Sequence, residues 1–288
     1  MLILGFPDYA RQAQALAAAA NVDCEIIELR RFPDGESLLR LPPVLPEQVI
    51  ICRSLDRPND KLVELLLAAE NARALGARHL TLVAPYLCYM RQDKAFNEGE
   101  AVSQQIIGRF LAGVFDTLLT VDPHLHRISN LAEAVPATAA ISLSAASQMG
   151  VFLARRASHP LIVGPDEESG QWVREVAGSA SLEYVVAKKI RQGDRQVEIS
   201  LPQCDYAGRD IVLVDDIGST GATLAVAARA LREAGAGRID VLVTHALFVG
   251  DALAQMNAAG ISEVWSSDSV SHSSNIFELA PLLASALK

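Results

Sequence analysis

The fold is decided by the stretch Ile211-Val-Leu-Val-Asp-Asp-Ile-Gly-Ser-Thr-Gly-Ala-Thr223. Its first four residues are apolar and mostly β-branched, which predicts a buried strand of a parallel sheet. Residues 222–234 are rich in alanine and predict a helix. The turn between them would present backbone N–H groups and the positive end of the helix dipole to one point, an arrangement that suits a phosphate.

Two carboxylates, Asp215 and Asp216, stand between the predicted strand and this turn. They would repel a phosphate, so we expect them to hold something beside it that offers hydroxyls or a metal ion. A sugar 5-phosphate meets both demands, with its 2- and 3-hydroxyls on the aspartates. The simpler alternative is a turn with solvated aspartates, because Gly and Asp are common in turns for backbone reasons. The order Asp-Asp-x-x-x-Thr-Gly-x-Thr favours the sugar-phosphate site, whose predicted residues are Asp215, Asp216, Gly218, Ser219, Thr220, Gly221 and Thr223.

The bulk composition limits the class of protein. A chain of 288 residues is long enough for two domains of ordinary size. Its net charge of −9 argues against a nucleic-acid partner, which needs a concentrated positive surface. The four cysteines form no Cys-x-x-Cys pair, so neither a disulfide framework nor a zinc site is expected. Without a signal-peptide pattern or a run of about 18 apolar residues, we expect a cytoplasmic protein with no membrane partner.

Apolar runs alternate with amphipathic stretches along the whole chain, which predicts parallel sheets covered by helices on both faces. The expected strands are 2–4, 49–52, 79–84, 117–121, 161–163, 184–187, 211–214, 240–244 and 263–266, and the expected helices are 9–20, 62–75, 101–112, 171–176, 224–234 and 252–259. Thr120-Val-Asp-Pro-His124 ends a strand much as Leu213-Val-Asp-Asp-Ile217 does, which indicates a duplication with domains 1–145 and 146–288. A closing helix over 276–287 would pack back on the first domain, on a neighbouring subunit, or on its own core.

Four further segments carry a resemblance to a known family: Phe32-Pro-Asp-Gly-Glu36, Asn59-Asp-Lys-Leu-Val-Glu-Leu-Leu67, Tyr89-Met-Arg-Gln-Asp-Lys94 with Glu98-Gly-Glu100, and Val121-Asp-Pro-His124. With the aspartate turn, they resemble the ribose-phosphate diphosphokinase (PRPP synthetase) family of the phosphoribosyltransferase superfamily, over essentially the whole chain. The resemblance implies two tandem type I phosphoribosyltransferase domains, each a mainly parallel sheet flanked by helices. The implied reaction moves the diphosphoryl group of ATP to the 1-hydroxyl of ribose 5-phosphate, giving PRPP and AMP for nucleotide biosynthesis.

The same resemblance assigns an ATP site. In the family, the loop that matches 32–36 contacts adenine in the ATP site of a neighbouring subunit, so at least a homodimer is expected. Without the resemblance, 32–36 would be an Asp-Gly turn beside a core phenylalanine, and 91–94 would be a solvated polar loop. The implied ATP-binding residues are Phe32, Asp34, Glu36, Arg91, Gln92, Asp93, Lys94 and His124.

Polyphosphate substrates imply Mg²⁺ as cofactor, and His124 and Asp166 match the family positions that hold the Mg–ATP complex. Imidazole is an unusual ligand for Mg²⁺, so His124 is expected to act through a bound water or a phosphate. Besides Asp215, the implied catalytic residues are Lys189 and Arg191, which would stabilise charge on the transferred phosphates. Lys188 aligns almost as well as Lys189, and a basic, exposed strand edge is the alternative for all three. Residues 192–203 are polar enough to form a moving lid over the site.

The sequence also departs from the family's common bacterial and animal pattern. Leu-His-Arg-Ile-Ser-Asn follows His124, and the chain is short, as in the archaeal-type branch. These departures leave regulation by ADP or phosphate open. Oligomer size and metal and nucleotide preference are left open by the sequence as a whole. A P-loop kinase is excluded by its missing motif, and a base phosphoribosyltransferase would not explain 91–94. The remaining alternative to an enzyme is a non-catalytic homologue that binds and regulates an active synthetase.

Overall fold

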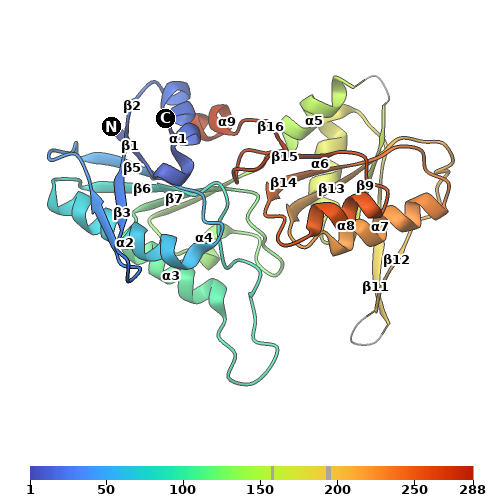
Figure 1. Cartoon of the computed structure of the whole chain (residues 1–288), viewed down its shortest axis with the longest axis horizontal. Coiled ribbons are helices and arrows are strands. Elements are labelled where there is room, and N and C mark those ends of the chain that lie inside the picture. Colours follow the sequence, from blue (N-terminus) through green and yellow to red (C-terminus); the bar gives the residue numbers. More distant parts are fainter. Residues whose placement is uncertain (157–158, 193–195, 288) are drawn as a thin grey trace. The chain divides into compact units, whose positions relative to one another are not determined.

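The computed structural model describes residues 1–156, 159–192 and 196–287, without the side chains of 190–192 and 196–198. The chain divides into two compact units (Figure 1). Unit 1 comprises Met1–Leu143 with Glu278–Lys288, and unit 2 comprises Ser144–Phe277. Among the helices of the described residues, none is both long enough and apolar enough to cross a bilayer.

Unit 1 is built on a six-stranded parallel sheet with the order β2-β1-β5-β6-β7-β8. A two-stranded antiparallel hairpin, β3-β4, stands beside it. The strands are β1 (Leu2–Gly5), β2 (Asp23–Ile26), β3 (Glu28–Arg31), β4 (Ser37–Arg40), β5 (Gln48–Cys52), β6 (His79–Val83), β7 (Thr117–Val121) and β8 (Ala139–Leu143). The helices are the 3₁₀ turn η1 (Pro7–Tyr9), α1 (Ala10–Ala20), α2 (Pro58–Ala74), α3 (Ser103–Val114), α4 (Leu131–Ala134) and α9 (Ala280–Ser285).

Unit 2 repeats this plan with the parallel order β10-β9-β13-β14-β15-β16 and the hairpin β11-β12. Its strands are β9 (Leu161–Gly164), β10 (Tyr184–Val186), β11 (Lys188–Gln192), β12 (Gln196–Ser200), β13 (Ile211–Gly218), β14 (Ile239–Ala246), β15 (Val264–Ser267) and β16 (Asn275–Phe277). Its helices are α5 (Ala146–Ala154), α6 (Gly170–Ala180), α7 (Ala222–Glu233) and α8 (Ala252–Ala258). The predicted pair of mainly parallel, helix-flanked sheets is therefore confirmed.

The apolar run of β13 shows why such strands form. Ile211 and Leu213 pack into a core with α7 and α8, whereas Val212 and Val214 pack into a second core with α5 and α6. Side chains of a strand alternate between its faces, so only a strand that is apolar at every position can lie between two layers of helices. In unit 1, the chain runs from β1 to β2 on one side of the sheet and from the neighbouring β5 to β6 on the other. In unit 2, it runs in the same way from β9 to β10 and from β13 to β14. The gap between β1 and β5, or between β9 and β13, is the topological switch point, where open α/β sheets bind ligands.

The strand register shows which residues of the two units correspond. The last residue of β5, Cys52, pairs with the last residue of β1. In unit 2, Leu213 pairs with the last-but-one residue of β9, so Val214 is the equivalent of Cys52. The next residue along the chain is Arg53 in unit 1 and Asp215 in unit 2. The two switch points therefore carry opposite charges at the same position.

This correspondence corrects one sequence-based expectation. Asp122 was matched with Asp215, but β7 is the fifth strand of its sheet and β13 is the third of its own. The N–H of Asp122 donates to the carbonyl oxygen of Leu143 (2.9 Å), and the N–H of Asp268 donates to that of Phe277 (3.1 Å). Asp122 therefore corresponds to Asp268, because each follows the fifth strand and bonds to the end of the sixth.

The last helix of each repeat packs against the other unit, not against the unit that contains the strand before it. Helix α5 follows β8 of unit 1 but packs against α6 of unit 2, and α9 follows β16 of unit 2 but packs against α1 of unit 1. The closing helix is shorter than expected, because 276 and 277 belong to β16 and Pro281 stands in the first turn of α9. Each unit is thus completed by a helix that follows the last strand of the other unit.

Candidate functional site

Three carboxylates gather at the switch point of unit 2. Asp166 follows β9, and Asp215 and Asp216 lie near the carboxyl end of β13. Asp166 and Asp216 are buried, with exposed fractions of 7% and 2%. Burial raises the pKa of Asp215 well above its ordinary range, and the neighbouring charges of Asp216 and Asp166 raise it further. A cluster of three carboxylates suits a cation or a set of hydroxyl donors.

The turn after β13 is shaped by its glycines. A Cβ on Gly218 would lie 2.2 Å from the ring of Phe248, and Gly221 has a positive φ of 72°. The loop after β14 closes on this turn, since the N–H of Phe248 donates to the Gly218 carbonyl (2.8 Å) and the N–H of Val249 to the Ser219 carbonyl (3.0 Å). Helix α7 begins directly after Gly221, and the first N–H groups of a helix have no intrahelical acceptor. The turn therefore has the backbone shape of an anion site.

Asp166 is held in a fixed orientation. Its Oδ1 accepts hydrogen bonds from the N–H groups of Glu168 (3.2 Å) and Ser169 (3.3 Å). Its Oδ2 lies 4.0 Å from the Nζ of Lys189 on β11, whereas Lys188 is exposed. Of the two lysines that the sequence left open, Lys189 is the one that lies beside the carboxylates. The side chain of Arg191, the other predicted catalytic cation, lies outside the described part of the chain.

In unit 1, the predicted adenine-contacting loop forms the tip of the β3-β4 hairpin. All of residues 32–36 are exposed, and Phe32 has an exposed fraction of 41%. The loop is held internally, because the N–H of Gly35 donates to the Phe32 carbonyl (2.9 Å) and the N–H of Glu36 donates to Oδ1 of Asp34 (3.2 Å). The hairpin therefore presents an aromatic ring and two carboxylates to solvent on an ordered turn.

The predicted Arg91–Lys94 block lies in the loop that joins β6 to α3. Arg91 and Lys94 are exposed, and the Nζ of Lys94 lies 4.8 Å from the ring centroid of Phe96. The side chain of Gln92 accepts a hydrogen bond from the hydroxyl of Ser103 (3.2 Å) at the start of α3. The two cations are thus presented on a loop that is tied to the following helix.

The loop after β7 is joined to this block. Its Arg127 forms an ion pair with Asp93, whose carboxylate is almost fully buried. His124 lies in the same loop, with its ring centroid 4.1 Å from that of His126. The structure therefore brings 91–94 and the loop of His124 together. Arg127 had no assigned role from sequence, and its only local signal is its position three residues after His124.

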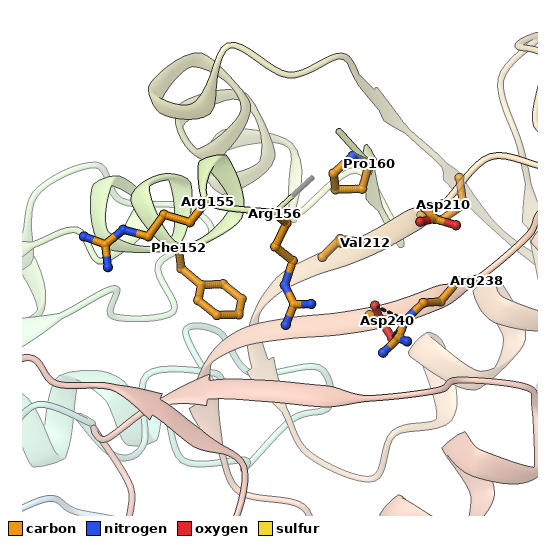
Figure 2. A pocket seen from close by; sticks show the side chains of 9 residues that line it. Phe152, Arg155, Arg156, Pro160, Asp210, Val212, Arg238 and Asp240 are labelled. Carbon is orange, nitrogen blue, oxygen red and sulfur yellow. Dashed lines mark hydrogen bonds and ion pairs between the residues drawn. The ribbon is translucent and has the colours of Figure 1, made fainter. Parts of the chain in front are cut away.

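A separate pocket of about 650 Å³ lies at the amino ends of β13 and β14 (Figure 2). The guanidinium of Arg156 lies 3.9 Å from the ring centroid of Trp265, and Arg238 is paired with Asp240 (2.8 Å). This is the edge of the sheet opposite to Asp166 and Asp215. Catalytic groups of α/β sheets lie at the carboxyl ends of the strands, so the pocket is not the candidate site.

Comparisons with known proteins agree with this geometry. Residues 1–114 match the family model described as the N-terminal domain of ribose phosphate pyrophosphokinase, and residues 147–261 match the phosphoribosyl transferase domain. A solved structure titled phosphoribosylpyrophosphate synthetase from Mycobacterium smegmatis matches with a TM-score of 0.85 and 22% identity, covering 99% of this chain and 97% of that one. At this identity the likeness shows the fold. Fold and site together define a protein of two tandem phosphoribosyltransferase-type domains.

Sequence relatives narrow the class. The chain is 35% identical to a ribose-phosphate pyrophosphokinase of Methanopyrus kandleri, with 100% of this chain and 99% of the relative covered. It is 32% identical to the protein of the same name from Methanothermobacter thermautotrophicus, with both chains fully covered. The chain belongs to the ribose-phosphate pyrophosphokinase family of enzymes. The resemblance to the family and to its archaeal members is thereby confirmed.

Proposed function

We propose that the protein transfers the diphosphoryl group of ATP to the 1-hydroxyl of ribose 5-phosphate, giving PRPP and AMP. The observation that carries this proposal is the switch point of unit 2. There, Asp166, Asp215 and Asp216 lie beside a glycine-rich turn and the N-terminus of α7. Such a site offers hydrogen-bond donors to a phosphate and acceptors to sugar hydroxyls within one turn of chain.

In the proposed reaction, ribose 5-phosphate places its phosphate in the turn at 218–223 and its 2- and 3-hydroxyls on Asp215 and Asp216. The 1-hydroxyl oxygen forms a bond to the β-phosphorus of ATP, and the bond from that phosphorus to the oxygen bridging the α-phosphate breaks. AMP leaves with the electron pair. Asp215, with its raised pKa, is the base of this chain that would accept the hydroxyl proton. Lys189 and Arg191 would stabilise the charge on the transferred group.

Mg²⁺ fits the residues at this site. Hard cations take oxygen ligands, and Asp166 and Asp215 share a carboxylate cluster in which burial, and then the neighbouring charges, raise the pKa of Asp215. When bound, Mg²⁺ would neutralise phosphate charge. Asp166 would hold it directly, and His124 would hold the Mg–ATP complex through a water or a phosphate. Adenine would be contacted by Phe32, Asp34 and Glu36, and the polyphosphate by Arg91–Lys94.

The assembly proposed for this reaction is a homodimer or a larger homo-oligomer, in which the loop 32–36 completes the ATP site of a neighbour. The exposed ring of Phe32 on an ordered turn supports this proposal. Sedimentation of the active enzyme tests it, and a fully active monomer would contradict it.

Product analysis tests the reaction. The purified protein is incubated with ATP, Mg²⁺ and ribose 5-phosphate, and the products are followed by ³¹P NMR. AMP and PRPP in equal amounts are expected. ADP with a ribose bisphosphate would replace the proposal with a single-phosphoryl kinase. Absence of turnover with retained binding of ribose 5-phosphate would indicate the non-catalytic regulatory homologue.

Two neighbouring lysines give a matched test of the site. We expect Lys189→Ala to lower kcat by roughly 100-fold or more, because it removes a cation that lies 4.0 Å from Asp166. Lys188→Ala removes the same charge from an exposed position, and kcat should stay within about twofold of the wild type. Equal losses in the two variants, or a larger loss for Lys188→Ala, would contradict the assignment.

A further inference from the structure

Helix α2 carries a buried carboxylate that no role so far described explains. Glu64 has an exposed side-chain fraction of 1%, and it lies in the segment 59–67 that sequence singled out. It shares the inward face of α2 with Ala68 and Ala72, four and eight residues further along. A buried, ionised carboxylate is costly unless its charge is compensated, so its partners indicate what it does.

Those partners lie on both sides of the hairpin tip. Oε1 of Glu64 accepts hydrogen bonds from Nη2 of Arg31 (3.1 Å) and from the hydroxyl of Ser37 (2.8 Å). Arg31 and Ser37 are the pair of the β3-β4 ladder that adjoins the loop 32–36. One carboxylate oxygen therefore holds both ends of the predicted adenine-contacting loop.

The other oxygen of Glu64 is held from the sheet. Its Oε2 lies 2.7 Å from Nη1 of Arg53, whose side chain is only 3% exposed. The Nε of Arg53 pairs with Asp8 (3.1 Å), and its guanidinium stacks 4.0 Å from the ring centroid of Phe6. Arg53 is therefore fixed by three contacts, and Glu64 connects the hairpin to a rigid point at the end of β5.

A purely stabilising role does not account for this arrangement. Replacing a buried ion pair by apolar residues of similar volume is often neutral or favourable, so such pairs are weak evidence for stability. Hydrogen bonds to a carboxylate do fix direction and distance, and here they fix the base of a loop whose own residues are exposed. We infer that Glu64 is a positioning residue for nucleotide binding, which acts by holding the hairpin that carries Phe32, Asp34 and Glu36. The part of the inference that concerns nucleotide binding rests on the proposed function. The anchoring of the hairpin by Glu64 does not depend on it.

The variant Glu64→Gln tests the inference, because it keeps the shape of the side chain and removes its charge. We expect the KM for ATP to rise about tenfold, since a misplaced binding loop loses contacts with the substrate. The kcat and the KM for ribose 5-phosphate should stay within about twofold of the wild type. Amide hydrogen exchange in 28–40 should become at least about tenfold faster, while β1, β5 and β6 keep their protection.

Glu70→Gln is the matched control, since it removes the same charge from an exposed position of the same helix. It should change neither the exchange of the hairpin nor the KM for ATP. If Glu64→Gln fails to fold, Ser37→Ala leaves the Glu64–Arg53 pair in place and should shift both readouts in the same direction by a smaller factor. If the wild type makes no AMP and PRPP, the proposed function fails. Hairpin exchange then stays the first readout, and the Kd for ATP from calorimetry takes the place of the KM for ATP. Unchanged exchange in the hairpin, or faster exchange with unchanged ATP affinity, would overturn the inference.

Discussion

The two units share one strand order but carry opposite chemistry at their switch points. In unit 2, burial raises the pKa of Asp215 well above its ordinary value, and the charges of Asp216 and Asp166 raise it further. In unit 1, the position of Asp215 is taken by Arg53, which pairs with Asp8 in η1, the turn that follows β1. The same backbone therefore carries a cluster of carboxylates in unit 2 and a buried, ion-paired arginine in unit 1. Function here follows from a few charges placed on a duplicated fold.

The turn after β13 in unit 2 and the turn after β5 in unit 1 also differ in how well they suit an anion. The turn in unit 2 has glycines and hydroxyls, and α7 begins right after Gly221. Helix α2 begins instead at Pro58, which has no N–H to offer. The Nζ of Lys61 donates to Asp56 (2.7 Å) and to the carbonyl oxygen of Ser54 (2.8 Å), so this turn is closed by its own cation. A phosphate would meet few donors in unit 1, the unit that carries the loops proposed to bind ATP.

The largest expected effect comes from removing the charge that distinguishes the site of unit 2. Asp215→Asn should lower kcat on the order of 1000-fold, about 4 kcal/mol of barrier, because it removes the carboxylate proposed to contact the reacting sugar. The same change should raise the melting temperature, because it relieves repulsion with Asp216 and Asp166. Enzyme assay and thermal unfolding measure the two effects. Activity within tenfold of the wild type, or a lower melting temperature, would contradict this comparison.

The corresponding change in unit 1 should affect stability. Arg53→Met keeps the bulk of the side chain but leaves Asp8 and Glu64 without their shared cation. Breaking a buried pair by removing one partner costs about 3–5 kcal/mol, and the remaining bonds of Glu64 to Arg31 place this case toward the lower part of that range. Urea unfolding measures the loss. A free energy of unfolding within about 1 kcal/mol of the wild type would mean that Arg53 does not hold the switch point of unit 1 together.

The exchanged terminal helices give a third pair of matched variants. Leu283 on α9 and Leu153 on α5 are both buried, and each helix follows a strand of the other unit. Leu283→Ala and Leu153→Ala should each cost about 3 kcal/mol. Hydrogen exchange should locate the loss in β1 and β2 for Leu283→Ala, and in β9 and β10 for Leu153→Ala. The reverse pattern would show that the helices do not support the units to which the structure assigns them.

The apolar strands and the aspartate turn were visible in sequence because each is a local pattern. Four consecutive apolar residues in 211–214 predict a buried strand without any knowledge of its neighbours. The hairpins were missed because β3 and β4 are largely exposed and show no apolar run. Helix α5 was missed as well, although its nine residues are largely apolar.

Arg53 and Glu64 could not have been assigned from sequence. Arg31, which helps to compensate Glu64, is 33 residues away from it along the chain. Burial of a charge depends on such distant partners, which local periodicity does not report. The only local signal was an acidic residue on the face of α2 that also carries Ala68 and Ala72. The duplication was visible, but its register was not, because the strands that correspond are defined by their order in the sheet.

The smallest expected effect is a pH dependence that belongs to Glu64 alone. Burial by itself would raise the pKa of Glu64, but the hydrogen bond from Ser37, the ion pair with Arg53 and the hydrogen bond from Arg31 outweigh it and hold the pKa below its ordinary value of 4.5. A carboxylate with a lowered pKa contributes stability above its unfolded value and loses it as the pH falls through the folded value. Glu64→Gln should therefore cost about 2 kcal/mol at pH 7, since it removes charged hydrogen bonds.

That difference should shrink as the pH falls below 4.5, because the wild type then loses the charge that the variant never had. Groups outside this network contribute equally to both proteins, so they cancel in the difference in free energy of unfolding. Besides Glu64, the network contains the carboxylates of Asp60, which pairs with Arg31, and Asp8, which pairs with Arg53. Urea unfolding of both proteins from pH 7 to pH 3 measures it. A difference that stays constant over this range would mean that the carboxylate is not ionised in the folded protein. The contacts of Glu64 with Arg31 and Arg53 would then not be ion pairs.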